Sequence, residues 1–302
     1  MKSLISYFLL FIAGLCSSCS SDIIKSDNKK ICNDSEILSQ ITFFNDSLLR
    51  TKIVTRGSTE NSLYWMSVIS ADCAGAYEGG RIGAKCGMII GHPHAVAAFG
   101  ALVAGSWASY KVHRTLTRSS TSVFNEQVMP VRIAGALIAA KEQDVDISDN
   151  FSTEITLPLS NEKIKEIGAK HNIVLQNLID ENIDIENLAK YLSKEELELI
   201  QSEDFRLDCE NAIANIHHNF NSGNAQQTEN ITISDKLMSL FYNIYQKYPS
   251  NYEDAQLVIN KYVEVVKNTT EIPEQDKQMI FQAISVAASS YEFWMSKINT
   301  NL

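Results

Sequence analysis

Apolar side chains recur every three or four residues along most of this chain, from about residue 34 onward. This spacing places apolar residues on one side of a helix, whereas a strand would alternate polar and apolar positions. The pattern therefore predicts a mainly α protein folded as a helical bundle. A capping box at Ser193-x-x-Glu196 marks one helix start. The other expected helices cover residues 34–52, 61–91, 95–110, 160–178, 205–220, 234–247, 252–267 and 273–298.

The segment between residues 112 and 160 has a weaker pattern. Residues 133–140 form a short apolar run after Pro130, and residues 153–157 could be extended. Neither feature is long or regular enough to assign as a strand. We therefore assign no strand here, and the structure of this segment stays open.

Glycines recur at a spacing of four within the second expected helix. Each one costs a helix interior roughly 1 kcal/mol relative to alanine. The missing side chains do, however, allow another helix to come very close. We therefore predict five helix-packing residues on this helix, Gly75, Gly79, Gly83, Gly87 and Gly91.

The expected partner is the segment 95–110, which carries no charge and follows a His-Pro-His turn at residues 92–94. Because proline ends a helix or opens the next one, the chain can reverse at this turn. We therefore predict a tight hairpin over residues 61–111, with one face of small residues against another. The helix-packing residues expected on the second helix repeat the spacing of four: Ala97, Ala101 and Gly105.

Three environments suit such a hairpin. It could be buried in a bundle, it could leave the bundle to insert or oligomerise, or it could span a membrane permanently. A spanning helix needs about 20 apolar residues, whereas residues 95–110 are fewer and the first helix carries charges. The sequence argues against permanent spanning, and burial is the simplest interpretation.

The N-terminal residues have the pattern of an export signal. Lys2 supplies a positive charge, and residues 4–15 form an apolar stretch that is too short to span a membrane. The stretch from Cys16 to Cys19 resembles a bacterial lipobox, with Cys19 as the lipidated residue after two serines and Cys16 where leucine is usual. The resemblance implies a lipoprotein of the bacterial cell envelope. Because no aspartate directly follows Cys19, it also implies the outer membrane.

These features divide the chain into four expected parts. A polar linker at residues 221–230 is the best internal boundary. The parts are a lipoprotein signal peptide at 1–18, a polar tether at 19–33, a helical domain at 34–222 that contains the hairpin, and a C-terminal helical segment at 231–302 packed on the same domain.

Charge narrows the choice of partners. The formal net charge is −10, and no stripe of lysine and arginine is present. Such a chain is a poor nucleic-acid binder, and anionic headgroups would repel it. We therefore expect no nucleic-acid partner, and membrane contact through the N-terminal lipid anchor.

Catalytic signatures are absent from the sequence. It has no G-x-S-x-G, no H-E-x-x-H and no phosphate-binding glycine loop that ends in Lys-Ser or Lys-Thr. We therefore predict no catalytic residue, no metal site and no cofactor. His171 falls on or near an apolar stripe, where a buried core histidine is the simpler interpretation and an enzyme site is the alternative.

Four cysteines lie beyond the lipobox: Cys32, Cys73, Cys86 and Cys209. An exported protein can form disulfides. Cys73 and Cys86 cannot pair within one continuous helix, because thirteen residues rise about 20 Å and the two thiols point to nearly opposite faces. Pairings of Cys32 or Cys209 with either remain open, and free buried thiols are the simpler interpretation.

The small-residue spacing from residue 71 to 110 resembles glycine-zipper and bacteriocin-like segments of exported, Bacteroidetes-type lipoproteins. That resemblance implies an exported, membrane-perturbing protein and brings no catalytic residues with it. We expect a lipid-anchored envelope protein whose hairpin serves helix packing, self-association through the glycine face or membrane contact. The alternatives are a bacteriocin-like toxin that inserts into membranes and an enzyme with a site near His171.

Overall fold

The apolar stripes of the sequence fold as helices that bury them. The computed structural model describes residues 35–53, 60–90, 93–117, 125–143, 145–147, 154–222 and 232–300. Within these residues there are eleven α-helices and no strand, which confirms the prediction of a mainly α helical bundle. The α-helices are α2 (Glu36–Ile53), α3 (Glu60–Ile90), α4 (Pro93–Thr117), α5 (Met129–Glu142), α6 (Glu162–Ile179), α7 (Leu188–Tyr191), α8 (Lys194–Gln201), α9 (Glu203–Ser222), α10 (Ile233–Lys247), α11 (Tyr252–Asn268) and α12 (Glu274–Thr300).

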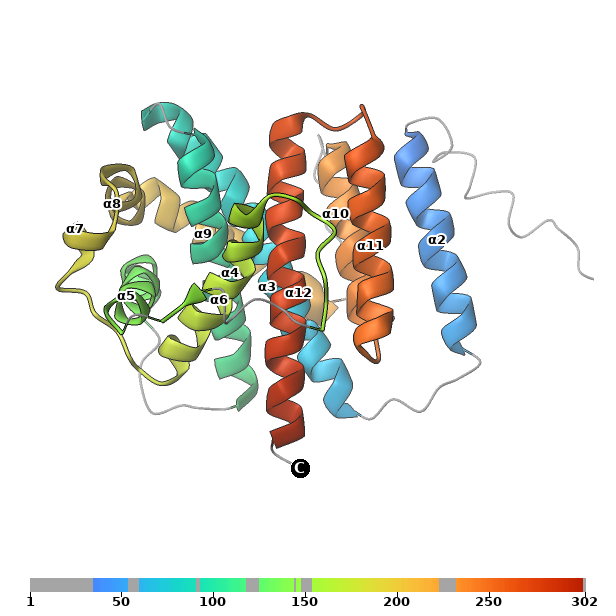
Figure 1. The fold of residues 1–302 in the computed structure, drawn as a ribbon, viewed down its shortest axis with the longest axis horizontal. Coiled ribbons are helices and arrows are strands. Elements are labelled where there is room, and N and C mark those ends of the chain that lie inside the picture. Colours follow the sequence, from blue (N-terminus) through green and yellow to red (C-terminus); the bar gives the residue numbers. More distant parts are fainter. Residues whose placement is uncertain are drawn as a thin grey trace, which may run out of the picture.

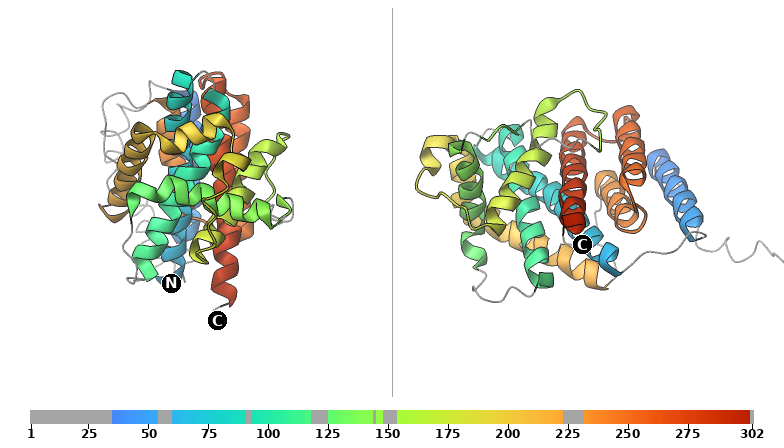
Figure 2. Two further views of the ribbon diagram at one scale, coloured as in Figure 1. Left: turned by 90° about the vertical axis from the view of Figure 1, so that its left-hand side faces the viewer. Right: turned by 60° about the horizontal axis from the view of Figure 1, so that its bottom comes forward.

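Helices α3 and α4 form an antiparallel pair at the centre of the bundle (Figure 1). Helix α12 packs across α3 and α6, while α10, α11 and α2 lie to one side and α5, α7, α8 and α9 lie to the other. The right-hand view of Figure 2 shows α2 at the outer edge of this arrangement. The hairpin is therefore covered by protein on several sides.

Side-chain caps fix several of the helix starts. The predicted capping box at Ser193 and Glu196 is present at the start of α8, where each side chain bonds the other's backbone N–H. Thr232 and Asp235 form a second capping box at the start of α10. Asn161, one residue after the predicted start, caps α6 by accepting from the Lys163 N–H.

Residues 112–160, whose apolar pattern is weak, contain helix α5 and one extended segment. Helix α5 is longer than the apolar run, because Pro130 sits in its first turn, where its missing N–H costs nothing. Residues 154–160 are extended, with alternate residues buried. The side chain of Gln256 bonds both the N–H and the C=O of Thr156, at 2.7 and 2.8 Å. The segment is thus held by a side chain, and not by a neighbouring strand.

The C-terminal helices and the hairpin share one core. Trp294 of α12 and Trp107 of α4 are both fully buried, and Trp294 stacks on Trp65 of α3 with ring centroids 4.8 Å apart. A Cβ at Gly168 of α6 would overlap the backbone of Ser285 on α12. The last helices therefore pack directly on the N-terminal ones.

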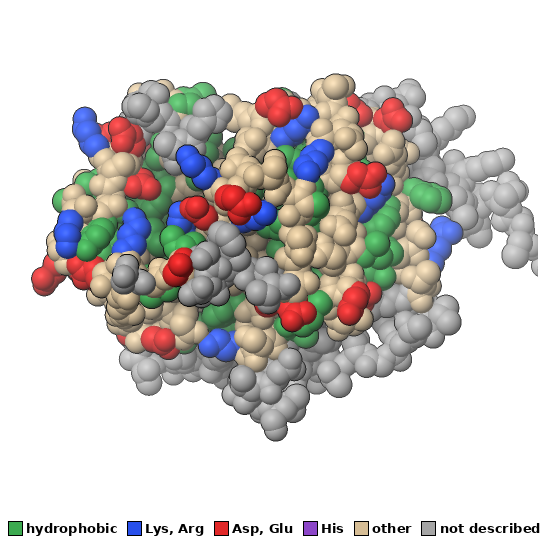
Figure 3. Space-filling model, in the orientation of Figure 1, with side chains coloured by type: hydrophobic (Ala, Val, Ile, Leu, Met, Phe, Trp, Pro, Cys, Tyr) green, Lys and Arg blue, Asp and Glu red, His purple; other side chains and the backbone are tan. Residues whose placement is uncertain are grey.

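Charged side chains of α3 form ion pairs with neighbouring helices at the surface. Arg81 is 3.1 Å from Asp235 of α10, and Lys85 is 3.0 Å from Asp208 of α9. Elsewhere on the surface, acidic and basic side chains are interspersed, as Figure 3 shows for one face. These pairs are partly exposed, so they orient the helices more than they stabilise them.

Several predictions concern residues that lie outside the described ranges. They are the signal peptide at 1–18, the tether at 19–33 with Cys19 and Cys32, the helix-packing residue Gly91, and most of the linker at 221–230.

Candidate functional site

The glycine face of α3 meets the backbone of α4. A Cβ built at Gly75 or Gly83 would lie 2.6 Å from a carbonyl oxygen of α4. At Gly79 it would overlap both the Gly100 carbonyl and the Ala104 methyl group. Real Cβ atoms do not come this close to other atoms. The two helices could therefore not keep this separation with any larger residue at these positions.

The predicted residues of α4 take part in this contact, though not all in the same way. Ala97 lies against Gly83, and Gly105 lies against Ala76. Ala101 instead faces Gly80, where the contact is an ordinary 3.7 Å. Gly87 is buried in α3.

The closest approach involves Gly100, which the sequence analysis did not select. A Cβ on Gly100 would overlap the Gly79 carbonyl. Counting forward in steps of four from Ala97 passes over this position. A helix that crosses another at a small angle also uses steps of three, which connect Ala97 with Gly100.

A buried carboxylate lies beside this glycine face. Asp72 of α3 has no solvent exposure. Its Oδ2 accepts hydrogen bonds from the Ser290 hydroxyl and from Trp294 Nε1, the latter at 3.2 Å. Both donors come from one face of α12, since they are four residues apart. Nε2 of His171, on α6, lies 4.0 Å from the same oxygen.

Burial shifts the pKa of both ionisable groups toward the neutral form. It raises the pKa of Asp72 from 3.8 to about 7, although hydrogen bonds from Ser109, Ser290 and Trp294 partly offset this. It lowers the pKa of His171 from 6.5 to about 4, against smaller opposing effects of the Asn172 side chain and the Gly105 carbonyl. At neutral pH the imidazole is therefore uncharged, and the carboxyl group is close to its midpoint.

A carboxyl group beside an imidazole could act as a general acid and base, but no opening lets a substrate reach Asp72 or His171. Both side chains have 0% exposure, so a substrate could touch neither without separation of the helices. The interpretation of His171 as a buried core residue fits this position. A chain of hydrogen bonds continues from its Nδ1 to Asn172, which donates to the Ser289 carbonyl at 2.8 Å. The arrangement ties α3, α6 and α12 together.

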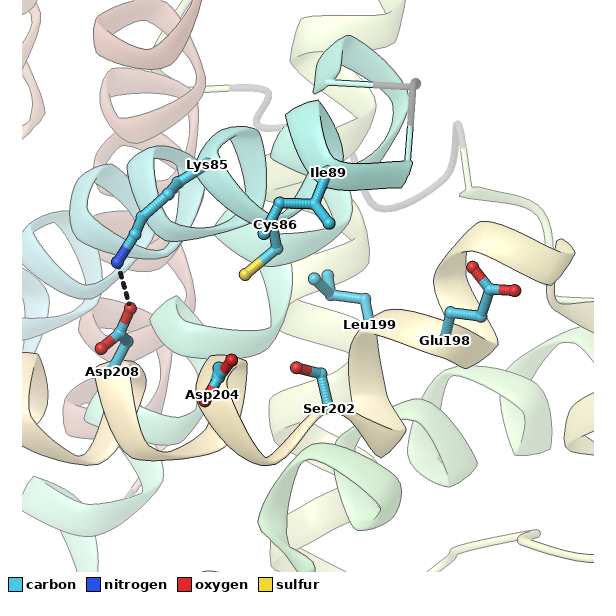
Figure 4. Close-up of a pocket in the computed structure, with 8 residues that line it drawn as sticks. All are labelled: Lys85, Cys86, Ile89, Glu198, Leu199, Ser202, Asp204 and Asp208. Carbon is cyan, nitrogen blue, oxygen red and sulfur yellow. Dashed lines mark hydrogen bonds and ion pairs between the residues drawn. The ribbon is translucent and has the colours of Figure 1, made fainter.

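A cavity of about 460 Å³ lies elsewhere, between the end of α3 and helices α8 and α9 (Figure 4). The Cys86 sulfur points toward α9 in this view, and the Lys85–Asp208 ion pair borders the cavity. Burial, followed by the charge of Asp208, raises the pKa of the Cys86 thiol. The cavity is lined by Lys85, Cys86, Ile89, Glu198, Leu199, Ser202, Asp204 and Asp208.

This cavity is acidic but does not gather metal ligands. In the described part of the chain, no group of three or more His, Cys, Asp or Glu residues could hold a metal ion. Cys73, Cys86 and Cys209 are all free thiols. Next to the cavity, Met88 and Ile89 at the end of α3 are 63% and 81% exposed.

Comparisons with known proteins add no further assignment, because no family model, curated protein or solved structure matches the chain. Among the described helices, none has both the length and the apolar character needed to cross a bilayer.

Proposed function

We propose that this protein is a lipid-anchored, non-enzymatic protein of the bacterial cell envelope, located at the outer membrane, whose glycine hairpin serves helix packing within its own bundle. One observation supports this role of the hairpin: the backbone of α4 lies in direct contact with the glycine face of α3. A second copy could use this face for self-association only after the hairpin opened. The burial of Asp72 and His171 supports a structural role for this pair over a catalytic one.

The anchor is proposed from the sequence around Cys19. We expect that Cys19→Ala abolishes incorporation of a labelled fatty acid and moves the protein out of the membrane fraction, since the preceding apolar stretch cannot serve as a span. Cys16→Ala is the matched control, because it changes a neighbouring cysteine and should leave labelling intact. Unchanged membrane association and labelling of the Cys19 variant would refute the anchor.

One observation favours the toxin as the second candidate. The small-residue hairpin lies at the centre of the bundle, where surrounding helices would shield it until they met a membrane. Against this, no described helix is suited to span a bilayer. The net charge of −10 also opposes contact with anionic lipids.

Dye-loaded liposomes separate these two candidates. We expect that the purified, unlipidated protein causes no leakage at low micromolar concentration from vesicles of neutral or anionic lipid. Release of dye at that dose would favour the toxin and overturn the packing role. The measurement should be repeated at acidic pH, because protonation of carboxylates reduces repulsion by an anionic membrane.

A further inference from the structure

A cavity and an exposed apolar surface meet at the end of α3. The cavity of about 460 Å³ has an apolar wall, formed by Cys86 and Ile89 of α3 and by Leu199 of α8 (Figure 4). Ile89 is 81% exposed and its neighbour Met88 is 63% exposed, so the apolar surface continues from the cavity onto the outside of the helix. Exposed apolar side chains that adjoin one another, in contrast to scattered ones, are typical of interaction sites.

The helices opposite this wall are strongly acidic. Residues 194–210, which include α8 and the start of α9, hold seven Asp or Glu and two Lys or Arg. This short segment therefore carries half of the formal net charge of −10. Three of its carboxylates, Glu198, Asp204 and Asp208, line the cavity, where Lys85 pairs with Asp208 at 3.0 Å. The cavity thus combines an apolar wall with an excess of negative charge.

The two properties together decide which occupant fits. Nucleic acid and anionic lipid would be repelled by the carboxylates. In the described part of the chain no cluster of residues is suited to hold a metal ion. A small organic cation could pair with the carboxylates but would leave Met88 and Ile89 uncovered. A basic protein segment that also carries apolar side chains would cover both kinds of surface.

We propose that the surface around this cavity docks a basic, amphipathic segment of another protein. This surface, the cavity face, is formed by Met88, Ile89, Glu198, Leu199 and Asp204. An apolar side chain of the partner enters the cavity beside Leu199, and its lysine or arginine side chains pair with Glu198 and Asp204. Glu198 lies 3.5 Å from Lys194, but both side chains are exposed, so a partner can replace this pair at little cost. The inference does not depend on the proposed function, because the cavity face lies outside the glycine face.

The test adds a probe peptide to the purified full chain. The probe is a fluorescent helical peptide of about 14 residues, with leucines on one face and lysines on the other. We expect fluorescence anisotropy to show saturable one-to-one binding that weakens as salt is added, since salt screens exposed charges. A peptide with glutamate in place of lysine should not bind. A peptide with serine in place of leucine should bind about tenfold more weakly, because it buries less apolar surface.

Matched variants locate the binding. Glu198→Gln combined with Asp204→Asn should weaken binding about fivefold or more. The control is Glu253→Gln combined with Glu264→Gln, which removes the same charge from exposed positions of α11 and should leave binding unchanged. Ile89→Ser should weaken binding about tenfold without unfolding the protein, because this side chain is exposed.

A photocrosslinking derivative of the probe gives a measurement on the wild-type chain. Its attachment points, mapped by peptide mass spectrometry, should fall within residues 85–89 and 198–208. The proposal is overturned by the absence of saturable binding, by attachment elsewhere, by equal weakening in the α11 control, or by equally tight binding of the serine-containing peptide. The last result would indicate a surface that attracts any small cation. Self-association of the chain that Ile89→Ser abolishes would identify a second copy as the occupant and would also overturn the proposal.

Discussion

Replacing Gly79 by alanine is expected to destabilise the protein by about 2 kcal/mol or more, although alanine is the better helix former. The added methyl group would overlap the Gly100 carbonyl and the Ala104 side chain on α4. Relief requires the two helices to separate along their contact, and such overpacking typically costs about 1–3 kcal/mol or more. The gain in helix propensity, roughly 1 kcal/mol, has the opposite sign and is too small to offset the overlap.

Gly80 offers a matched control one residue away on the same helix. A Cβ there would meet its nearest neighbours at 3.6–3.7 Å, which is ordinary van der Waals contact. Gly80→Ala should therefore be neutral or stabilising by up to about 1 kcal/mol. Urea unfolding of both variants measures the difference. If Gly79→Ala were as stable as Gly80→Ala, the close contact between α3 and α4 would be wrong.

Substitutions of Asp72 and His171 are expected to change the pH dependence of stability in opposite directions. In the folded state Asp72 keeps its proton up to about pH 7, whereas an unfolded aspartate loses it near pH 3.8. Its stabilising contribution is therefore complete below pH 3.8 and is lost as the pH rises to 7. Over this range the change amounts to roughly 4 kcal/mol, at about 1.4 kcal/mol per pKa unit.

The contribution of His171 to stability changes with pH in the opposite direction. Its folded pKa of about 4 lies below the ordinary 6.5, so its contribution is complete above pH 6.5 and is lost as the pH falls to 4. That change is roughly 3 kcal/mol. Between pH 4 and 6.5 the folded pair holds one proton on Asp72, and the unfolded pair holds one on His171. The two contributions therefore nearly cancel in the wild-type protein.

Each single variant exposes the contribution of the other group. Relative to wild type, Asp72→Asn should gain stability as the pH rises from 4 to 7, and His171→Gln should lose stability over the same range. Denaturant unfolding at several pH values measures both differences, and the remaining titrating groups cancel in the comparison. Curves for the two variants that ran parallel to wild type would show that neither group is as deeply buried as the structure has it.

The helices could be predicted from the sequence because their cause is local. Apolar stripes and capping residues such as Ser193 act within a few residues of chain, and the described helices begin close to the expected positions. Gly75, Gly79 and Gly83 could be predicted as helix-packing residues, because residues spaced four apart in an uninterrupted helix lie on one continuous face. Helix α5 was not predicted, since its apolar run is too short to assign as a helix.

The relation between helices was harder to predict. Gly100 makes the closest approach because of the angle and register of the crossing, which no single helix encodes. Asp72 lies seven residues before Gly79, on the same face, and this spacing could have indicated a buried carboxylate. Its partners Ser290 and Trp294 are more than 200 residues away in sequence, so only the fold brings them together.

Hydrogen exchange of the hairpin, measured by mass spectrometry with and without lipid vesicles, tests the central claim most directly. If the glycine face is closed within the bundle, peptides from residues 71–90 and 96–110 should exchange only through global unfolding. Their rates should then match the slowest peptides of α10 and α12 and should not change when vesicles are added. Faster exchange in the hairpin than in those helices, or a change on addition of vesicles, would contradict the account.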